Sequence, residues 1–303
     1  MSNQKPTNRK GVHFMSSKPD IKEIMKSLED GIANLMNSEQ YMKFLKTMSI
    51  FHGYSLNNTI LIMLQRPDAS LVAGYKKWQS IGRQVKKGEK SITILCPCST
   101  KRMEKLLDEN GKPVLDENGK EKKVEVPIPY FRPGNVFDVS QTVGKPVETL
   151  SPKELMNSVD GYENFLQSLI SISPVKVVFD NIESGAKGIY YPNEEKIVVQ
   201  TGMSNLQTLK TLIHESAHAR LHNNQAMEKT KKNRETEEVE AESVAYCVLS
   251  AFGFDTSDYS FPYIAGWSSG KDMKELKESL ETIRITSGQF IDEIQKVLEQ
   301  KAA

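Results

Sequence analysis

The chain has 303 residues, of which 38% are apolar and 26% charged, with 40 lysines and arginines against 39 acids. That length predicts about two domains, and the apolar share allows a core in each, which excludes collagen-like, mucin-like and fully disordered proteins. No apolar run approaches the roughly 18 residues of a membrane span, and the N-terminus lacks the apolar core of a secretory signal. Three cysteines are too few for a disulfide framework and favour a reducing compartment. We therefore expect a cytoplasmic protein with no membrane partner.

Charge is divided unevenly along the chain. Residues 41–105 hold 12 lysines and arginines against 3 acids, whereas residues 151–303 hold 16 against 23. A basic first half followed by an acidic second half indicates that the two halves have different partners.

The first predicted elements are helices. Residues 1–19 are polar and without periodicity, so we expect a flexible arm. Helices are then expected after Asp20, Ser38 and Ser55 as N-caps, and Pro67 stops the third.

Strands follow the helices in the first half. SITILCP alternates like a strand, and VPIPYF and NVFDVSQT are predicted to be two more. Between them LDENG occurs twice, at residues 107–111 and 115–119, and each Asn-Gly pair predicts a tight turn. These elements predict an α+β domain over residues 20–148.

A second domain is expected over residues 149–303. The linker is placed near residues 144–150, after which Ser151 and Pro152 fit a helix start. Strands in PVKVVFD, KGIYYP and EKIVVQ precede a helix capped by Ser204. Two further helices are expected, from about residue 235 to 251 and from about residue 271 onward.

The helix after Ser204 contains an HExxH sequence formed by residues 214–218. Residues four apart lie on the same face of a helix, so the imidazoles of His214 and His218 can reach one metal ion. Glu215 can reach a metal-bound water, whose pKa zinc lowers, and take its proton as hydroxide attacks a carbonyl. The pattern predicts zinc bound by His214 and His218, with Glu215 as catalytic base, rather than two histidines that only hydrogen-bond in a core.

A catalytic zinc site needs a third protein ligand, and the next helix is rich in glutamates. Glu238 lies on the predicted apolar seam of that helix, which contains Ala241, Ala245 and Val248. We therefore predict Glu238 as the third ligand, with Glu240 and Glu242 as alternatives.

Other polar residues near the predicted ligands are expected to support the site or to face solvent. Glu242, one turn beyond Glu238, is predicted to accept an imidazole N–H and so fix a ligand's tautomer. Glu237 and Glu240 are expected to face solvent. His222 is four residues beyond the second histidine of the motif and is left without an assigned role.

HESAHARLH and the downstream ExEAExxAY helix resemble the gluzincin-type metallopeptidases, in particular the ImmA/IrrE-like group of mobile-element regulators. KGIYYPNEEKIVVQTGMS is similar to the strand pair that precedes the metal helix in that group. The resemblance covers roughly residues 155–255. It implies a zincin core made of a small sheet, a metal helix and a glutamate helix.

Aromatic and basic residues interleave in the first half. Such surfaces bind single-stranded nucleic acid because cations follow phosphates and aromatic rings stack on bases. Trp78 is expected in the core instead. The candidate contacts to single-stranded DNA are Tyr75, Lys76, Lys77, Arg83, Lys86, Lys87 and Lys90.

The Asn-rich helix start, GYKKWQSIGRQVKKGEKSITIL and YFRPGNVFDVSQT resemble the N-terminal domain of ArdC-type antirestriction proteins. That resemblance implies a single-stranded-DNA-binding domain followed by a zincin-like domain. It also implies a mobile-element protein associated with protecting incoming DNA from host restriction. The LDENG repeat departs from the family pattern and leaves the strand register near residues 100–125 open.

Two other functions remain open at the level of sequence. One is an ImmA-type regulatory protease that cleaves a repressor, with the first half as a docking domain. The other is a DNA-binding protein whose zinc site is structural or vestigial. The sequence names neither a host or element-encoded protein substrate nor the DNA site size and polarity, and it leaves the oligomeric state open.

Overall fold

The computed structural model describes residues 20–35, 37–147, 161–223, 232–256, 259 and 261–302, which form an α+β protein. The arm expected at residues 1–19 and the helix start expected at Ser151 and Pro152 lie outside the described residues. Within the described part, no helix is long and apolar enough to cross a membrane.

Helices dominate both halves of the chain. In the first half they are α1 (Ile21–Asn34), α2 (Ser38–Ile50), α3 (Leu56–Gln65), α4 (Tyr75–Ser80) and the 3-10 helix η1 (Val139–Gln141). In the second half they are α6 (Gly161–Ile172), η2 (Pro192–Glu194), α7 (Asn205–Leu221), α9 (Arg234–Ala251), α10 (Ile264–Ser268) and α11 (Met273–Ala302).

Within the described residues, the strands form three sheets. The first has the order β1-β4-β3 and the second pairs β2 with β5, where the strands are β1 (Val72–Gly74), β2 (Arg83–Val85), β3 (Ile92–Lys105), β4 (Lys123–Asp138) and β5 (Thr142–Gly144). The third has the order β6-β8-β7, formed by β6 (Lys176–Asp180), β7 (Gly188–Tyr191) and β8 (Lys196–Gln200). In it the central strand β8 is parallel to β6 and antiparallel to β7.

Helix caps explain where the early helices begin. The Ser55 side chain accepts the N–H of Asn58 and caps α3, as predicted. The N-cap of α2 is Asn37 rather than Ser38, because the Asn37 side chain accepts the N–H of Gln40. The expected helix therefore forms with its cap one residue earlier.

One continuous strand, β4, replaces the two strands predicted from VPIPYF and NVFDVSQT. Gly134 is at the junction, and a Cβ added there would collide with the sulfur of Cys96 on the neighbouring strand. Glycine thus allows the two strands to approach closely without a break. After Asp138 the chain turns into η1, so SQT does not extend the strand.

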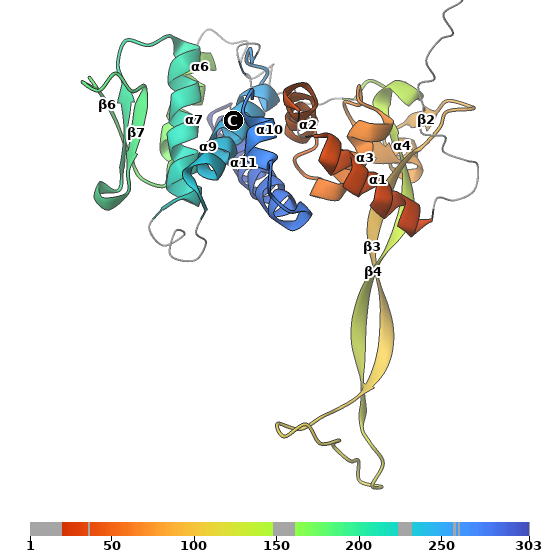
Figure 1. Ribbon diagram of the computed structural model, residues 1–303. Helices are drawn as coiled ribbons and strands as arrows, with labels where there is room; N and C mark the ends of the chain where they lie inside the picture. The colour runs from red at the N-terminus through yellow and green to blue at the C-terminus, as the bar shows by residue number, and fades with distance from the viewer. Residues whose placement is uncertain are drawn as a thin grey trace, which may run out of the picture. The chain divides into compact units, whose positions relative to one another are not determined.

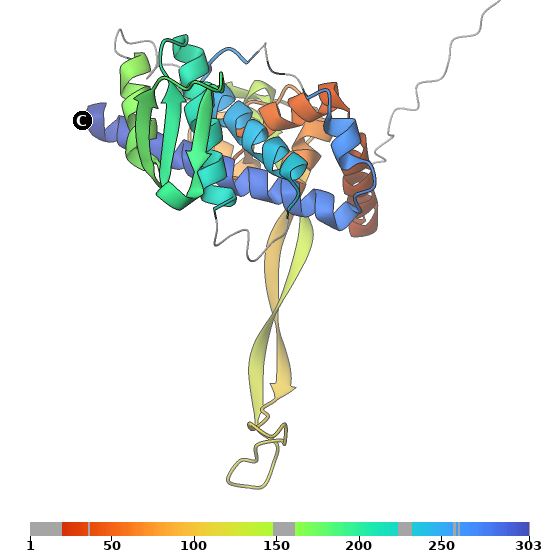
Figure 2. The ribbon, with the colours of Figure 1, turned by 60° about the vertical axis from the view of Figure 1, so that its left-hand side comes forward.

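Residue contacts divide the described chain into two units. One groups residues 20–27 with Ile94–Gly134, and the other groups Leu28–Thr93 with residues 135–302. The first unit is largely a ribbon of β3 and β4, whose strands twist about each other (Figure 2). Both LDENG segments form the predicted turns, in which Asp108 and Asp116 accept backbone N–H groups.

The second unit contains elements from both halves of the sequence. Helix α2 packs against α9, and the Tyr41 hydroxyl lies 2.8 Å from the Ser243 hydroxyl in a buried contact. Cys247 of α9 donates to the carbonyl of Leu45, 3.5 Å away. The residues of the two predicted domains therefore share a core at this place.

The strands and helices predicted within the described residues of the second half are confirmed, and they are layered. Helix α7 packs on one side against β7 and β8 and on the other against α9, which in turn packs against α11 (Figure 1). The apolar residues Ile197 and Val199 of β8 and Leu209 and Leu212 of α7 are fully buried. This layering holds one face of α7 against one face of α9, where the candidate site lies.

Candidate metal centre

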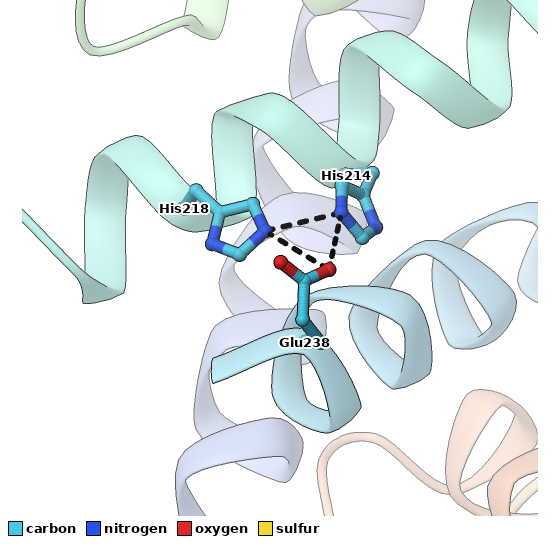
Figure 3. Close-up of side chains that lie close together, drawn as sticks. All are labelled: His214, His218 and Glu238. Atoms are coloured by element: carbon cyan, nitrogen blue, oxygen red, sulfur yellow. Dashed lines mark hydrogen bonds and ion pairs between the residues drawn. The ribbon is translucent and has the colours of Figure 1, made fainter. Parts of the chain in front are cut away.

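Helix α7 carries the HExxH motif, whose histidines and glutamate are half-buried. The Ser204 side chain caps it by accepting the N–H of Gln207, as predicted. Ile213 and Ala217, each next to a motif histidine or glutamate in the sequence, are fully buried. Because these apolar residues fix the rotation of the helix, His214 and His218 point together toward α9 (Figure 3).

Helix α9 supplies the opposing carboxylate. Ala241, Ala245 and Val248, the predicted seam, are all fully buried. This rotation turns Glu238 toward the two histidines of α7 (Figure 3).

Three candidate ligand atoms converge. Nε2 of His218 lies 3.0 Å from Nε2 of His214. Oε2 of Glu238 lies 3.5 Å from Nε2 of His214 and 3.8 Å from Nε2 of His218. Ligands about 2.0–2.1 Å from a tetrahedral ion are separated by about 3.4 Å, so the three atoms fit around one zinc-sized cation. Among the described residues they form a group able to hold a metal ion.

Electrostatics at the site favour a positive charge. Burial tends to lower the pKa of His214, but hydrogen bonds from its ring to Glu238 and Glu242 raise that pKa to about 9. Hydrogen bonds from His214 and His218, together with their charge, hold the pKa of the Glu238 carboxyl far below its usual range. The carboxylates thus attract a cation to the position where the two imidazoles meet.

Glu242 lies behind His214, where the sequence places a carboxylate that fixes a tautomer. Its Oε2 is 3.3 Å from Nδ1 of His214, and its Oε1 is 2.7 Å from Nζ of Lys210. A carboxylate on Nδ1 orients the ring with Nε2 toward Glu238. Lys210 also lies over the Tyr259 ring, 3.7 Å from its centroid. Nothing in the sequence distinguishes Lys210 from any other solvated lysine on a helix.

Glu215 is held between α7 and the edge strand β7. Burial raises the pKa of its carboxyl, opposed by His214, His218 and a hydrogen bond from the backbone N–H of Tyr190. A Cβ added at Gly188 would lie 2.9 Å from the Cγ of Glu215. Because Gly188 has no side chain, the Glu215 side chain can occupy this space. No feature of the sequence predicted this role of Gly188.

Glu240 is fully buried, so the prediction that it faces solvent is wrong. Its carboxylate accepts hydrogen bonds from Lys232, 2.7 Å and 2.8 Å away, and from Ser279, and its Oε2 lies 3.1 Å from Nε2 of His222. These partners hold its pKa down although burial tends to raise it. The sequence hides this arrangement because Lys232 and Ser279 come from outside the helix.

The predicted DNA-contacting residues lie along α4, β2 and the turn after β2. Tyr75 is 44% exposed and the lysines are exposed, whereas Trp78 is in the core as expected. Two of the cations also bind the protein itself. Arg83 donates to the Oγ1 and the carbonyl of Thr142, 2.7 Å and 3.1 Å away, and Lys86 donates to the carbonyl of Ser140.

Comparison with known proteins places the first half in a family. Residues 20–137 match the sequence model of the N-terminal domain of anti-restriction factor ArdC. The chain is 31% identical over 316 residues to the uncharacterized protein pXO2-81 of Bacillus anthracis, which covers 93% of this chain and 52% of that protein. It is 29% identical over 169 residues to DNA primase TraC of Escherichia coli, covering 53% of this chain and 11% of that protein. The chain thus spans about half the length of the first relative and about a tenth of the second.

Two crystal structures of the antirestriction ArdC protein from plasmid R388 are also similar. The metal-free structure has a TM-score of 0.48 at 20% identity, covering 82% of this chain and 86% of that one. The Mn(II)-bound structure has a TM-score of 0.45 at 18% identity, covering 81% and 89%. The family assignment rests on the sequence match of the first half: residues 20–137 are an ArdC-type N-terminal domain.

Proposed function

We propose that this chain binds single-stranded DNA through its basic first half and holds zinc in a peptidase-type site in its second half. We further propose that it protects DNA carried by a mobile element from host restriction. The observation that carries the proposal is the convergence of His214, His218 and Glu238, with Glu215 next to them in the motif.

The donor set supports zinc as the resident metal. Two imidazole nitrogens and one carboxylate oxygen are a common ligand set of catalytic zinc sites and leave one position open. His214, His218 and Glu238 would hold the ion, and Glu242 orients His214. When bound, zinc lowers the pKa of a water molecule and polarises a carbonyl.

Glu215 is the proposed catalytic base. The backbone N–H of Tyr190 donates to its carboxylate, and Gly188, which has no side chain, leaves room for it. Its burial raises its pKa, which brings proton uptake nearer to neutral pH. The carboxylate takes a proton from the attacking water and delivers it to the leaving amine. A purely structural zinc site has no need for such a group.

Metal analysis of single variants tests the ligand assignment. Glu238→Ala should lose most of the bound zinc, because only two protein ligands remain. Glu237→Ala, a half-buried acid on the same helix, is the control and should keep it. Stoichiometric tight zinc in Glu238→Ala would contradict the assignment. Loss of zinc only in Glu242→Ala would mean that Glu242 is the third ligand.

Replacing the base separates chemistry from binding. Glu215→Gln should keep the metal and the fold while peptide hydrolysis falls about 10²–10⁴-fold, because an amide cannot take the proton. The measurement is cleavage of a peptide library by the wild type and the variant at equal zinc content. An unchanged rate in Glu215→Gln would rule out the role.

Charge and exposure support DNA binding by the first half. Lys76, Lys77, Lys87 and Lys90 are exposed and have no acidic partner among the described residues, so they are available to phosphates. Tyr75, at the start of α4, is available for stacking on a base. Arg83 and Lys86 are weaker candidates, because each already donates to backbone carbonyls of the protein.

Titration of the full-length chain with a labelled oligonucleotide at several salt concentrations tests this part. Four phosphate contacts on a single strand predict a log–log salt slope of about −3. Lys76→Glu with Lys77→Glu should weaken binding and flatten the slope, whereas Tyr75→Ala should weaken binding without changing it. Lys296→Glu, an exposed lysine of α11, is the control. Stronger binding to duplex than to single strands would contradict the proposal.

A regulatory peptidase that cleaves a host or element-encoded protein is the second candidate. The placement of Glu215 favours it over a protein with a vestigial site. If protection of DNA survives Glu215→Gln while a repressor is no longer cleaved, the peptidase acts in regulation rather than in protection.

A further inference from the structure

We propose that His222 and Glu240 are positioning residues for the metal: together they hold His218 in the tautomer whose Nε2 is free to bind an ion. This inference rests on the proposed metal site and adds two residues to it. Both lie outside the HExxH motif, and neither touches the point where the three ligand atoms converge.

The geometry is an unbroken chain of hydrogen-bonding groups leading away from that point. Nδ1 of His218 lies 2.9 Å from Nδ1 of His222. Nε2 of His222 lies 3.1 Å from Oε2 of Glu240. His222 is 6% exposed and Glu240 is fully buried, so water does not compete for either contact.

At the Glu240 end of this hydrogen-bonded series, two more side chains hold the carboxylate in place. Lys232 and Ser279 both donate to the Glu240 carboxylate. Lys232 supplies a positive charge that balances the buried carboxylate, and Ser279 ties it to α11. Lys232 can only donate, and it reaches both oxygens of Glu240, so the geometry fixes Glu240 as an acceptor.

The Glu240 carboxylate determines which ring nitrogen of His222, and then which ring nitrogen of His218, carries a proton. Because Glu240 accepts, Nε2 of His222 carries a proton, and in a neutral ring Nδ1 of His222 is then an acceptor. Nδ1 of His218 must therefore be the donor, which leaves the lone pair on Nε2 of His218 facing His214 and Glu238. The opposite order would put a proton on Nε2 of His218 and block it as a ligand.

The structure thus gives the two ligand histidines different supports. Glu242 accepts directly from Nδ1 of His214, whereas Glu240 acts on His218 through the ring of His222. Partners of this kind typically change metal affinity by about 10–100-fold when removed.

Affinity for Co²⁺ measured by its visible absorption bands tests the proposal on the full chain. His222→Phe removes the acceptor for His218 and leaves Glu240 paired with Lys232 and Ser279, so it should weaken Co²⁺ binding about 10–100-fold. His222→Asn keeps an oxygen acceptor near the place of Nδ1 and should restore affinity to within a few-fold. Glu237→Gln is the matched control and should match the wild type.

The outcomes separate this inference from the metal site itself. Co²⁺ binding that survives loss of His214, His218 and Glu238 would refute the proposed site. Binding that depends on those three but is unchanged in His222→Phe would refute the positioning role alone. Equal weakening in His222→Phe and His222→Asn would assign the effect to packing, which also overturns it.

A second measurement on the wild type needs no variant and no metal. Long-range proton–nitrogen correlation spectra of ¹⁵N-histidine-labelled protein, with five histidines to assign, report the tautomer of each ring. We expect the proton on Nδ1 of His218 and on Nε2 of His222. A proton on Nδ1 of His222 would overturn the inference, even if His222→Phe failed to fold.

Discussion

The position of Glu215 depends as much on an absent side chain as on its own contacts. Gly188 of β7 faces α7, and a Cβ there would lie 2.5 Å from Thr211 Cγ2 and 2.9 Å from Glu215 Cγ. Both distances are below any ordinary contact, so one neighbour would have to move. The glycine is needed for close approach rather than for a special backbone angle.

The proposed role of Glu215 as catalytic base predicts that Gly188→Ala impairs peptide hydrolysis while leaving the proposed metal in place. Overpacking typically costs about 1–3 kcal/mol, and a small displacement of a catalytic group can lower a rate about 100-fold. Gly266→Ala is the control, because a Cβ at Gly266 meets nothing within 4 Å. Melting temperature, zinc content and peptidase rate would be measured together. Loss of zinc along with activity would show that the methyl group disrupts the histidines as well.

At the scale of elements, the sequence predicts best where a local pattern decides the structure. The caps at Ser55 and Ser204 and the strand pair around Pro192 form as expected, since hydrogen bonds between near neighbours create them. The same holds for the site: the spacing of His214 and His218 on one helix brings their Nε2 atoms together.

The predictions that fail depend on contacts between distant residues. In the sequence, Glu240 looks like a solvated glutamate. The fold brings Ser279, 39 residues away, and His222 into contact with its carboxylate. The strand expected over NVFDVSQT ends because Asp138 and Gln141 exchange the hydrogen bonds of a capping box around η1. The periodicity of apolar residues predicts neither the contacts of Glu240 nor the capping box of Asp138 and Gln141.

Asp138 also makes a prediction about stability and pH. Burial tends to raise its pKa, but hydrogen bonds from Ser140, Ser70 and Leu71 hold it below the ordinary value of 3.8. The carboxylate therefore stabilises the fold at pH values above 3.8, and this contribution is lost as the pH falls through the lower pKa of the folded state.

Asp138→Asn should lower the unfolding free energy by about 1–3 kcal/mol at pH 7, and the difference from the wild type should shrink as the pH falls below 3.8. Urea unfolding of both proteins across this range measures it. Asp30→Asn, an exposed residue of α1, should have little effect at any pH. A deficit in Asp138→Asn that stays constant to the lowest pH would show that charge is not the cause.

At the scale of the molecule, the two halves that the charge pattern separates are joined by a common core. Tyr41 of α2 is fully buried against α9, and Cys247 of α9 reaches the backbone of α2. A fragment ending near residue 148 would expose that face of α2. Residues 28–93 of the basic first half therefore belong to the same folding unit as α7 and α9.

The shared core predicts one cooperative unfolding transition for residues 28–93 and 135–302. The two tryptophans report on the two halves, since Trp78 and Trp267 are each 1% exposed. In each single-tryptophan variant, Trp78→Phe and Trp267→Phe, the fluorescence midpoint should coincide with the midpoint from circular dichroism. Separate midpoints would mean that the halves unfold independently.

The contact between Tyr41 and Ser243 has a consequence for how the protein is made, because 202 residues separate the two. At a synthesis rate of about 5–20 residues per second, α2 leaves the ribosome roughly 10–40 s before its partner helix exists. Throughout that interval the face of α2 that packs against α9, which includes Tyr41 and Met48, lacks its native partner. The nascent chain therefore exposes an apolar helix face for that time, which is the kind of surface that chaperones shield.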